Sequence, residues 1–443
     1  MKARFALVAG AATLAALPAL AQTTIPISSA TNMTVGGLIA MGMKNSEISN
    51  GNAPATINGV ANPNYNRVIG SETGVYDNTS RLWFTSTSKV ADGWSVFMRI
   101  ESRIPMNVRP GDALLQNAGG PAGGLAVNDA SGWGDGDTWA GVGTPWGNFY
   151  AGHMHLYVTD PVSVGYLSPA LEAPGEGYRV WDVQGLGVFN ILNTYFTGRQ
   201  DGNGLLSKQN TLSITRSRNV VKWDSPMFKP DSESLLNFSL AWTKNAAGAQ
   251  NVWVSSANGT TYEGGQTIFA KGLYNGHGFS ALATYVDQKF QGVLASAANT
   301  ELKAMRLGLS YKWNGIKAGV LYDNTSMVNG GTTGATPVIV GDSGRTAYQI
   351  PVSYQWGDHG VYVTYTMAGK TASLDNTGAK QMTYAYDYAL TKRAFLGVQL
   401  TTINNDARVN YQGFLTGYSA FGTSSLLQGE SWRQVSLSLN YWF

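Results

Sequence analysis

Residues 431–443 read SWRQVSLSLNYWF and end the chain. Apolar side chains occupy every second position from Val435 onward, and Gln, Ser and Asn fill the positions between them. Because successive side chains of a β-strand point to opposite faces, this spacing predicts a strand with one apolar and one polar face. The apolar face ends in Leu439, Tyr441 and Phe443, where an exposed edge strand would carry charge or a breaker. The fold therefore depends on whether the rest of the chain repeats this pattern.

Alternating segments of this kind recur from residue 33 to the C-terminus, each about as long as a tilted strand that crosses a bilayer. The first five are residues 33–44, 78–90, 93–104, 137–144 and 147–155. Tight turns are predicted at 91–93, 275–278, 314–315, 357–360 and 391–393, and long polar loops at 245–265, 291–301, 327–344, 371–378 and 404–430. Short turns at one end and long loops at the other are typical of outer-membrane barrels. The sequence predicts an all-β, antiparallel transmembrane barrel of about 16 strands, or 18 if the segment after His155 contains a further hairpin.

The composition favours the same fold. Only 13% of the residues are charged, which is about half of the usual quarter for soluble globular chains. Aromatic residues make up 11%, and no apolar run after the first residues is long enough for a transmembrane helix. A secreted β-sandwich or β-helix would carry more charge. The chain has no cysteine, so disulfides play no part in its fold.

The N-terminus has the features of a secretory signal peptide. Lys2 and Arg4 precede an apolar run over residues 5–17, and Ala19-Leu20-Ala21 forms an A-x-A cleavage site. We expect residues 1–21 to be removed and residues 22–443 to form a single barrel domain. Without Lys2 and Arg4 the formal charge of +3 falls to +1, which argues against nucleic-acid binding.

Alternation also assigns charged residues to faces. In residues 93–104 the apolar Val96 and Met98 share one face, so Arg99, Glu101 and Arg103 lie on the other. A cation that faces lipid costs about 2 to 4 kcal/mol near the midplane, whereas a water-filled lumen accepts it. By the same reasoning the predicted pore-lining residues of the neighbouring segments are Arg81, Arg216, Arg218 and Lys222. We expect a basic ladder of Arg81, Arg99, Arg216 and Arg218, although any one cation could instead form a salt bridge in the wall or snorkel at the rim.

Three stretches resemble a known family. Residues 384–404 (YAYDYALTKRAFLGVQLTTIN), 216–228 (RSRNVVKWDSPMF) and 78–101 are similar to hairpins and strands of the Gram-negative general diffusion porins, most closely those of β-proteobacteria. Phe443, Tyr441 and Leu439 resemble the family's C-terminal assembly signal. The resemblance implies a sixteen-stranded homotrimeric barrel that the barrel-assembly machinery inserts into the outer membrane, among lipid and lipopolysaccharide. It also implies passive diffusion of small hydrophilic solutes and ions, through a pore narrowed by the third external loop.

The sequence departs from the family pattern in three places. Gly152-His153-Met154 stands where the family has G-R-Q, so one expected pore arginine is missing. The P-E-F-G-G signature of the inward loop is absent, and its nearest remnant is the APGEG of residues 173–177. Trp442 occupies a position that is usually polar in the family.

The segment 156–211 is too long for a simple connection, because loops beyond about 15 residues are usually functional. Its acidic residues are Asp160, Glu172, Glu176 and Asp182. We hypothesise that it folds into the barrel and sets these acids against the arginine wall. Opposed charges across a narrow aqueous gap select ions and orient dipolar solutes. The alternative is an external lid that contacts neighbouring subunits. On balance we expect a preference for anions.

Other functions find less support. The four histidines are His153, His155, His277 and His359, and no carboxylate or cysteine near His153 and His155 completes a metal-ligand set. No nucleophile elbow or P-loop is present, so we expect no enzymatic activity, cofactor or metal site. A substrate-selective channel for sugars or small organic acids is the nearest alternative, with a constriction lined by Tyr157, Tyr166, Tyr178, Trp181, Phe189, Tyr195 and Phe196. A barrel adhesin or structural protein is a further alternative, because its long loops would look similar.

Overall fold

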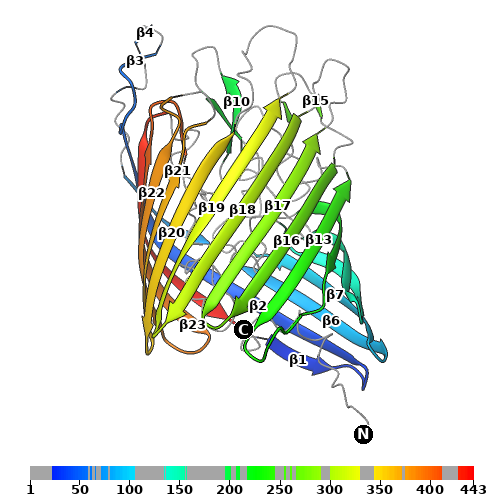
Figure 1. Cartoon of the computed structure of the whole chain (residues 1–443). Coiled ribbons are helices and arrows are strands. Elements are labelled where there is room, and N and C mark those ends of the chain that lie inside the picture. The colour runs from blue at the N-terminus through cyan, green and yellow to red at the C-terminus, as the bar shows by residue number, and fades with distance from the viewer. Residues whose placement is uncertain are drawn as a thin grey trace.

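The chain forms an all-β barrel in a computed structural model (Figure 1). The structure describes residues 22–57, 60–61, 65, 71–77, 80–104, 134, 136–154, 156, 195–200, 206–209, 217–244, 254–255, 260–261, 266–290, 300–329, 344–371, 375–411 and 428–443. Within these ranges no helix is long and apolar enough to span a membrane.

Sixteen antiparallel strands close into one wall. In order around the barrel they are β2 (Thr31–Ser49), β6 (Arg81–Ala91), β7 (Trp94–Arg103), β8 (Thr138–Thr144), β9 (Gly147–Met154), β12 (Ser217–Asp224), β13 (Leu235–Lys244), β16 (Gln266–Gly276), β17 (Phe279–Phe290), β18 (Thr300–Trp313), β19 (Ile316–Asn329), β20 (Arg345–Trp356), β21 (His359–Ala368), β22 (Ala379–Ala389), β23 (Ala394–Asn405) and β24 (Ser431–Trp442). The last strand, β24, pairs with β2 from Leu38 to Ser49 and so closes the wall. The predicted fold class and strand number are confirmed.

Tight turns join the strands at one end of the barrel. Two residues separate β6 from β7, β8 from β9, β16 from β17, β18 from β19 and β20 from β21. Asn314 and Gly315 both have positive φ, at 47° and 79°, which suits the primed turns that connect strands of a twisted hairpin. At the other end the connections are longer in sequence, from 9 residues between β17 and β18 to 62 residues between β9 and β12. The predicted asymmetry of short periplasmic turns and long external loops is therefore present.

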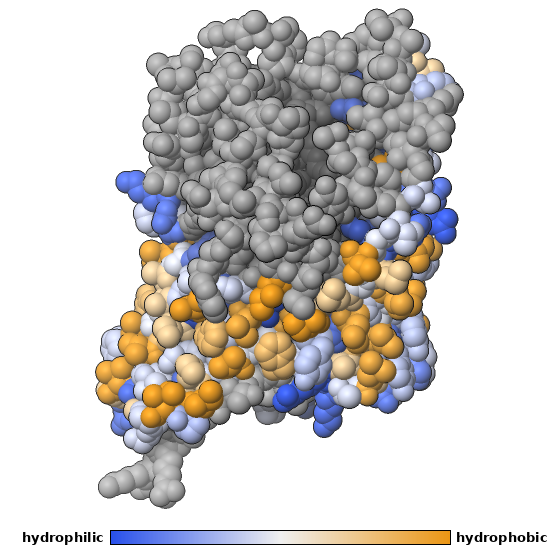
Figure 2. Space-filling model, turned by 180° about the vertical axis from the view of Figure 1, so that it is seen from behind, coloured by the Kyte–Doolittle hydropathy of each residue, from blue (hydrophilic) through white to orange (hydrophobic). Residues whose placement is uncertain are grey.

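The wall has an apolar outer face and a mainly polar inner face. On β24 the side chains of Val435, Leu437 and Leu439 are 39–49% exposed, whereas those of Ser436 and Ser438 between them are buried. Because a barrel in lipid presents apolar residues outward and polar residues to its lumen, this alternation sets the direction of each face. On the face that Figure 2 shows, apolar residues form a belt across the described outer surface, with hydrophilic residues at its borders.

Two short strands complete the pairing of β2, and the sequence analysis missed both. It ended the first strand at residue 44 and began the second at residue 78, with no strand between them. Instead β2 continues to Ser49, and β5 (Glu72–Asp77) pairs with its second half. On the other side, β1 (Gln22–Pro26) pairs with residues 32–36 of β2. A strand that crosses a membrane needs partners along its whole length, since lipid offers no hydrogen bonds to free N–H and C=O groups.

The remaining strands form three small two-stranded sheets apart from the wall. They are β3 (Thr56–Ile57) with β4 (Val60–Ala61), β10 (Tyr195–Gln200) with β11 (Leu206–Gln209), and β14 (Val254–Ser255) with β15 (Thr260–Thr261). The segment after His155 thus does contain a hairpin, β10–β11, but it adds no strand to the barrel.

Candidate functional site

The inner wall carries the charged residues, and the first group of them lies on β6 and β7. The Arg99 Nη2 atom is 2.6 Å from Glu101 Oε2, and Arg81 Nη1 is 3.7 Å from Glu101 Oε1. The Arg99 guanidinium also lies 5.1 Å from the centroid of a Trp83 ring. Cross-strand pairing of Trp83 with Glu101 places all four side chains on the inward face. Arg81, Arg99 and Glu101 therefore lie on the same face of the β6–β7 hairpin as Trp83.

Around this group the inner surface at the C-terminal end of β24 is apolar. Trp83 and Trp442 lie with ring centroids 6.1 Å apart, and both pack in a buried cluster with Leu38 and Phe395. Trp442 was noted above as a departure from the family pattern. Its large ring fills the inner surface where β24 meets β2, so packing explains why an apolar residue stands at this position.

The predicted arginines of residues 216–218 lie beyond an irregularity in β12. The pairing of β12 with β9 shifts register between Ser217 and Val220, and Asn219 has φ of 55°. The shift corresponds to one extra residue in β12, and such a bulge locally interrupts the alternation of faces. The side chains of Arg216, Arg218 and Arg103 lie outside the described residues, as do Asp160, Glu172, Glu176 and Asp182.

Lys222, on the regular part of β12, pairs with Tyr150 of β9 and Ala241 of β13. Its Nζ atom is 3.2 Å from Asp224 Oδ1 and 5.7 Å from the centroid of the Tyr150 ring. Asp224 in turn accepts a hydrogen bond of 2.5 Å from Ser239 Oγ on β13. Tyr150 packs against Trp139 and Phe97, with ring centroids 5.2 and 5.1 Å away. An inward aromatic group thus separates Lys222 from Arg99.

From Asp224 a line of directly paired residues continues across the tall part of the barrel. We call it the inner-wall row, and its members are Asp224, Ser239, Lys271, Thr284, Arg306 and Asp323, on β12, β13, β16, β17, β18 and β19. All six are buried. Arg306 Nε and Nη2 both lie 3.0 Å from Asp323 Oδ2, and these two side chains are 1% and 0% exposed. The row places the Lys271 ammonium of β16 and the Arg306 guanidinium of β18 on the lumen side of the wall, with Thr284 of β17 between them.

Sequence reasoning did not single out Lys271, Arg306 or Asp323. Arg306 alternates in the sequence with the apolar Met305 and Leu307, so the signal that it faces the lumen was present. The register of β18 with β17 and β19 brings Arg306 into line with Lys271. This register cannot be predicted from one segment alone.

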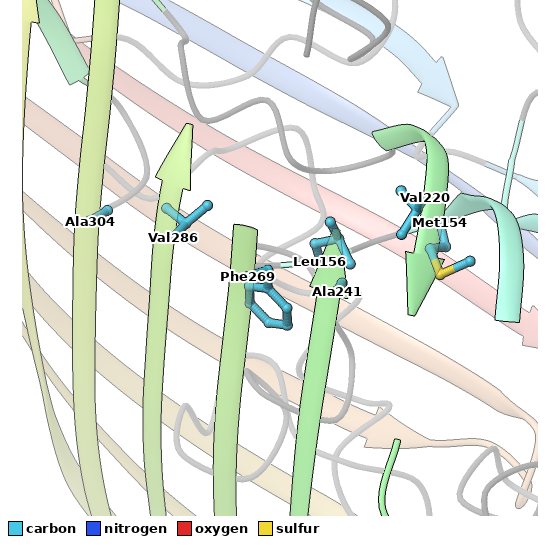
Figure 3. Packing of buried hydrophobic residues seen from close by; sticks show 7 residues of the cluster. All are labelled: Met154, Leu156, Val220, Ala241, Phe269, Val286 and Ala304. Atoms are coloured by element: carbon cyan, nitrogen blue, oxygen red, sulfur yellow. The ribbon is translucent and has the colours of Figure 1, made fainter. Parts of the chain in front are cut away.

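An apolar row runs parallel to the inner-wall row, two residues farther along each strand (Figure 3). It consists of Ala241, Phe269, Val286 and Ala304, continued by Val220 and Met154. Leu156, which follows β9, lies within this row and is 0% exposed. Figure 3 shows its side chain between Phe269 and Val220, so the chain turns onto the inner wall as soon as it leaves β9.

The described histidines form no metal site. Among the residues that the structure describes, no three His, Cys, Asp or Glu side chains are grouped to hold a metal ion. His277 lies in the β16–β17 turn, where Asp231 and Glu233 each approach one ring nitrogen at 3.1 Å. The hydrogen bond to Asp231 raises the pKa of His277, and the same contact lowers the pKa of Asp231 to about 2. His359 on β21 contacts Tyr386 OH at 2.8 Å, on the outer face of the barrel.

Comparisons with known proteins agree with this architecture. The anion-selective porin from Comamonas acidovorans superposes with a TM-score of 0.62 at 17% identity, over 93% of this chain and 100% of that one. The outer-membrane protein OmpT of Vibrio cholerae, in its trimer form, gives 0.53 at 10%, over 94% and 100%. Salmonella typhi OmpF, in complex with daunomycin, gives 0.53 at 12%, over 95% and 100%. No curated protein sequence matches the chain.

A family profile described as Gram-negative porin matches residues 6–408, which is most of the chain. This match agrees with the closed barrel of sixteen strands, and with the polar inner wall and the apolar belt outside it. The chain belongs to the Gram-negative porin family and forms an outer-membrane channel through which small hydrophilic solutes and ions diffuse passively.

Proposed function

We propose that this channel prefers anions. The observation that supports the proposal is the charge of the described inner wall, where cations outnumber carboxylates. The inward cations are Lys44, Arg81, Arg99, Lys222, Lys271, Arg306, Lys312, Lys317 and Arg345, and the inward or buried carboxylates are Glu101, Asp224, Asp323, Asp387 and Glu430. A wall with a surplus of one sign raises the local concentration of the opposite ion. The Comamonas porin is described as anion-selective, but the proposal for this chain depends on its own residues.

The narrowest part of the pore, in this proposal, lies where the segment 156–211 meets the inner-wall row. Leu156 begins that segment and is buried on the apolar row, which runs next to Lys271 and Arg306. Burying an apolar side chain contributes roughly 1.5–3 kcal/mol, enough to hold the start of the segment against the wall. We therefore favour the inward loop over the external lid, with Asp160, Glu172, Glu176 and Asp182 as its candidate acids.

The reversal potential in a planar bilayer under a KCl gradient tests the anion preference. For the unmodified protein we expect an anion-signed potential. Lys271→Gln should shift it toward cations, because it removes a buried charge from the row. Lys392→Gln, in the exposed β22–β23 turn, is the matched control and should leave the potential unchanged. A cation-signed potential for the unmodified protein, or equal shifts in both variants, would contradict the proposal.

We further propose a homotrimer whose subunits meet at a short part of the wall. Strands β8, β9 and β12 have 7, 8 and 8 residues, whereas β18 and β19 have 14 each. At about 3.4 Å per residue and a tilt near 40°, strands of 7 or 8 residues rise only about 16–20 Å, less than the apolar band of about 25 Å. Their outward side chains are apolar, with Phe149 45% and Val221 51% exposed. Contact with another copy would cover a wall too low to face lipid.

Native mass spectrometry tests this surface. We expect the detergent-solubilised protein to have the mass of three chains, and Phe149→Arg with Val221→Arg to give a folded monomer. A monomeric unmodified protein, or a variant that remains trimeric, would rule out the surface.

A substrate-selective channel is the second candidate, and the inward aromatic group supports it. Phe97, Trp139 and Tyr150 contact one another beside Lys222. A cation next to aromatic rings suits an aromatic carboxylate. Benzoate should then reduce the conductance in KCl more strongly than acetate at the same concentration, and Tyr150→Ala should remove the difference. Equal effects of the two anions would leave general diffusion as the function.

We also propose that the chain acts as a channel alone, without enzymatic activity, and that the mature chain begins at Gln22. The first strand, β1, starts at this residue, directly after the predicted cleavage site. N-terminal sequencing of protein purified from outer membranes tests the cleavage site.

A further inference from the structure

Two lysines face the lumen where the hairpin of β18 and β19 turns. Lys312 and Lys317 are directly opposite each other, and they form the last inward pair before the Asn314-Gly315 turn. They share the face of Arg306, whereas Tyr311 on the other face is 44% exposed on the outside of the barrel. Short turns lie on the periplasmic side of these barrels, so we call these two residues the periplasmic lysine pair.

The periplasmic lysine pair is more open to the lumen than the other cations of the tall wall. Among the described inward cations of β16 to β20, Lys271, Arg306 and Arg345 are only 1–5% exposed. Both members of the pair are partly exposed. Gly319, the next inward residue of β19, is also partly exposed and has no side chain to cover the wall. A solute in the lumen can therefore contact these two ammonium groups directly.

Two like charges in this arrangement repel each other. Residues directly opposite in an antiparallel pair have Cβ atoms about 4.5–5.5 Å apart, and like charges at such positions destabilise the sheet. An anion that lies between the two ammonium groups removes the repulsion. A doubly charged anion neutralises both groups while only one ion is immobilised, so the pair favours one dianion over two chloride ions.

The surroundings of the pair suit an oxyanion. Two of the adjoining inward positions are Ser310, on β18, and Ser353, which pairs with the lysine of β19. Their hydroxyl groups are hydrogen-bond donors of the kind that phosphate and sulfate oxygens accept. Along β19 the next inward carboxylate is Asp323, which pairs with Arg306, and Asp358 in the β20–β21 turn is exposed. Two cations and two hydroxyls thus meet at one point of the inner wall.

We propose that the periplasmic lysine pair is a binding site for doubly charged oxyanions, such as sulfate and hydrogen phosphate. Lys312 and Lys317 each donate a charge-assisted hydrogen bond to the same anion, and such bonds are about twice as strong as those between neutral groups. The inference rests on the proposed preference of the channel for anions. It adds a site at the periplasmic end of the pore that distinguishes dianions from chloride.

Isothermal titration calorimetry of the detergent-solubilised protein with sodium sulfate, in a chloride buffer, tests the site. We expect the unmodified protein to bind sulfate in the presence of excess chloride. Lys312→Gln with Lys317→Gln should weaken this binding at least about tenfold, because two charge-assisted hydrogen bonds are lost. Lys312→Arg with Lys317→Arg keeps both charges and should retain it. The matched control is Lys229→Gln with Lys392→Gln, which removes two exposed charges near the periplasmic turns and should leave sulfate binding unchanged.

Several results would overturn the proposal. They are an unmodified protein that binds no sulfate, a glutamine variant that binds it equally well, an arginine variant that loses it, and an equal loss in the control. The reversal potential in a KCl gradient separates this site from the proposed function. A cation-signed potential for the unmodified protein counts against the anion preference of the channel. An anion-signed potential without sulfate binding counts only against the periplasmic lysine pair.

Discussion

The buried ion pair of Arg306 and Asp323 offers the sharpest test of how the inner wall is stabilised. Removing the charge of Asp323 by Asp323→Asn leaves the Arg306 guanidinium 1% exposed without its counterion. Breaking a buried pair from one side costs about 3–5 kcal/mol. The two contacts of 3.0 Å support a similar figure, because each hydrogen bond to a charged group is worth about 1.5–3 kcal/mol. Since Asn can still accept one hydrogen bond, we expect a loss of about 3 kcal/mol.

Removing both charges should cost less than removing one. In Arg306→Met with Asp323→Leu the wall keeps apolar side chains of similar size, and no buried charge remains unpaired. We therefore expect the double variant to be more stable than Asp323→Asn by about 1–3 kcal/mol. The interaction free energy between positions 306 and 323 is then favourable, as expected for a buried ion pair. For an exposed ion pair this interaction energy is close to zero.

The assay is reversible urea unfolding of the barrel in lipid vesicles, followed by the gel mobility of the folded form and by tryptophan fluorescence. The exposed pair of Lys370 and Asp375, 3.2 Å apart, provides the control. Asp375→Asn should change stability by less than about 1 kcal/mol. A loss below about 1 kcal/mol for Asp323→Asn, or a double variant less stable than Asp323→Asn, would refute the interpretation of a buried, paired contact in the wall.

Three further predictions follow from single contacts. Gly37→Val should abolish the heat-modifiable folded form on a gel, since a Cβ at residue 37 would collide with the Phe443 ring. A normal folded band would show that strand closure tolerates the change. Leu156→Asp should raise single-channel conductance, because a charge in the apolar row releases the start of the segment 156–211 from the wall; unchanged conductance would argue against a constriction anchored there. The His277–Asp231 contact should stabilise the turns fully below the usual His pKa of 6.5 and lose this contribution as the pH rises through the raised pKa. Hydrogen exchange of residues 225–234 at pH 5.5 and 8.5 measures it, and His277→Asn, which suits the φ of 53°, should remove the difference.

The fold was predictable because a membrane barrel obeys a simple local rule. Each strand alternates between lipid and lumen, so the inward faces of Arg99 and Lys222 followed from their own neighbours. The rule fails where the backbone departs from regular pairing. β12 has a register shift between Ser217 and Val220, where Asn219 has φ of 55°; Asn tolerates this φ but does not by itself predict a shift. β1 and β5 were missed for a related reason, since their function is to satisfy the hydrogen bonds of a long neighbour.

The register between paired strands determines which residues of the inner-wall row meet. Part of this register can be predicted from the sequence and part cannot. A two-residue turn fixes the register of its hairpin, so Arg306 and Asp323, equally far from the Asn314-Gly315 turn, must face each other. Lys271 and Thr284 are related in the same way by the turn at His277 and Gly278. Between β17 and β18, however, the connection is long, and its length does not determine which residue meets Thr284. Within the inner-wall row, the turns thus predict the pairs Lys271–Thr284 and Arg306–Asp323. Barrel closure and packing set the register between these two pairs. It follows that shortening an external loop should leave the pair Arg306–Asp323 intact, while lengthening the β18–β19 turn should separate it and with it the charge balance of the row.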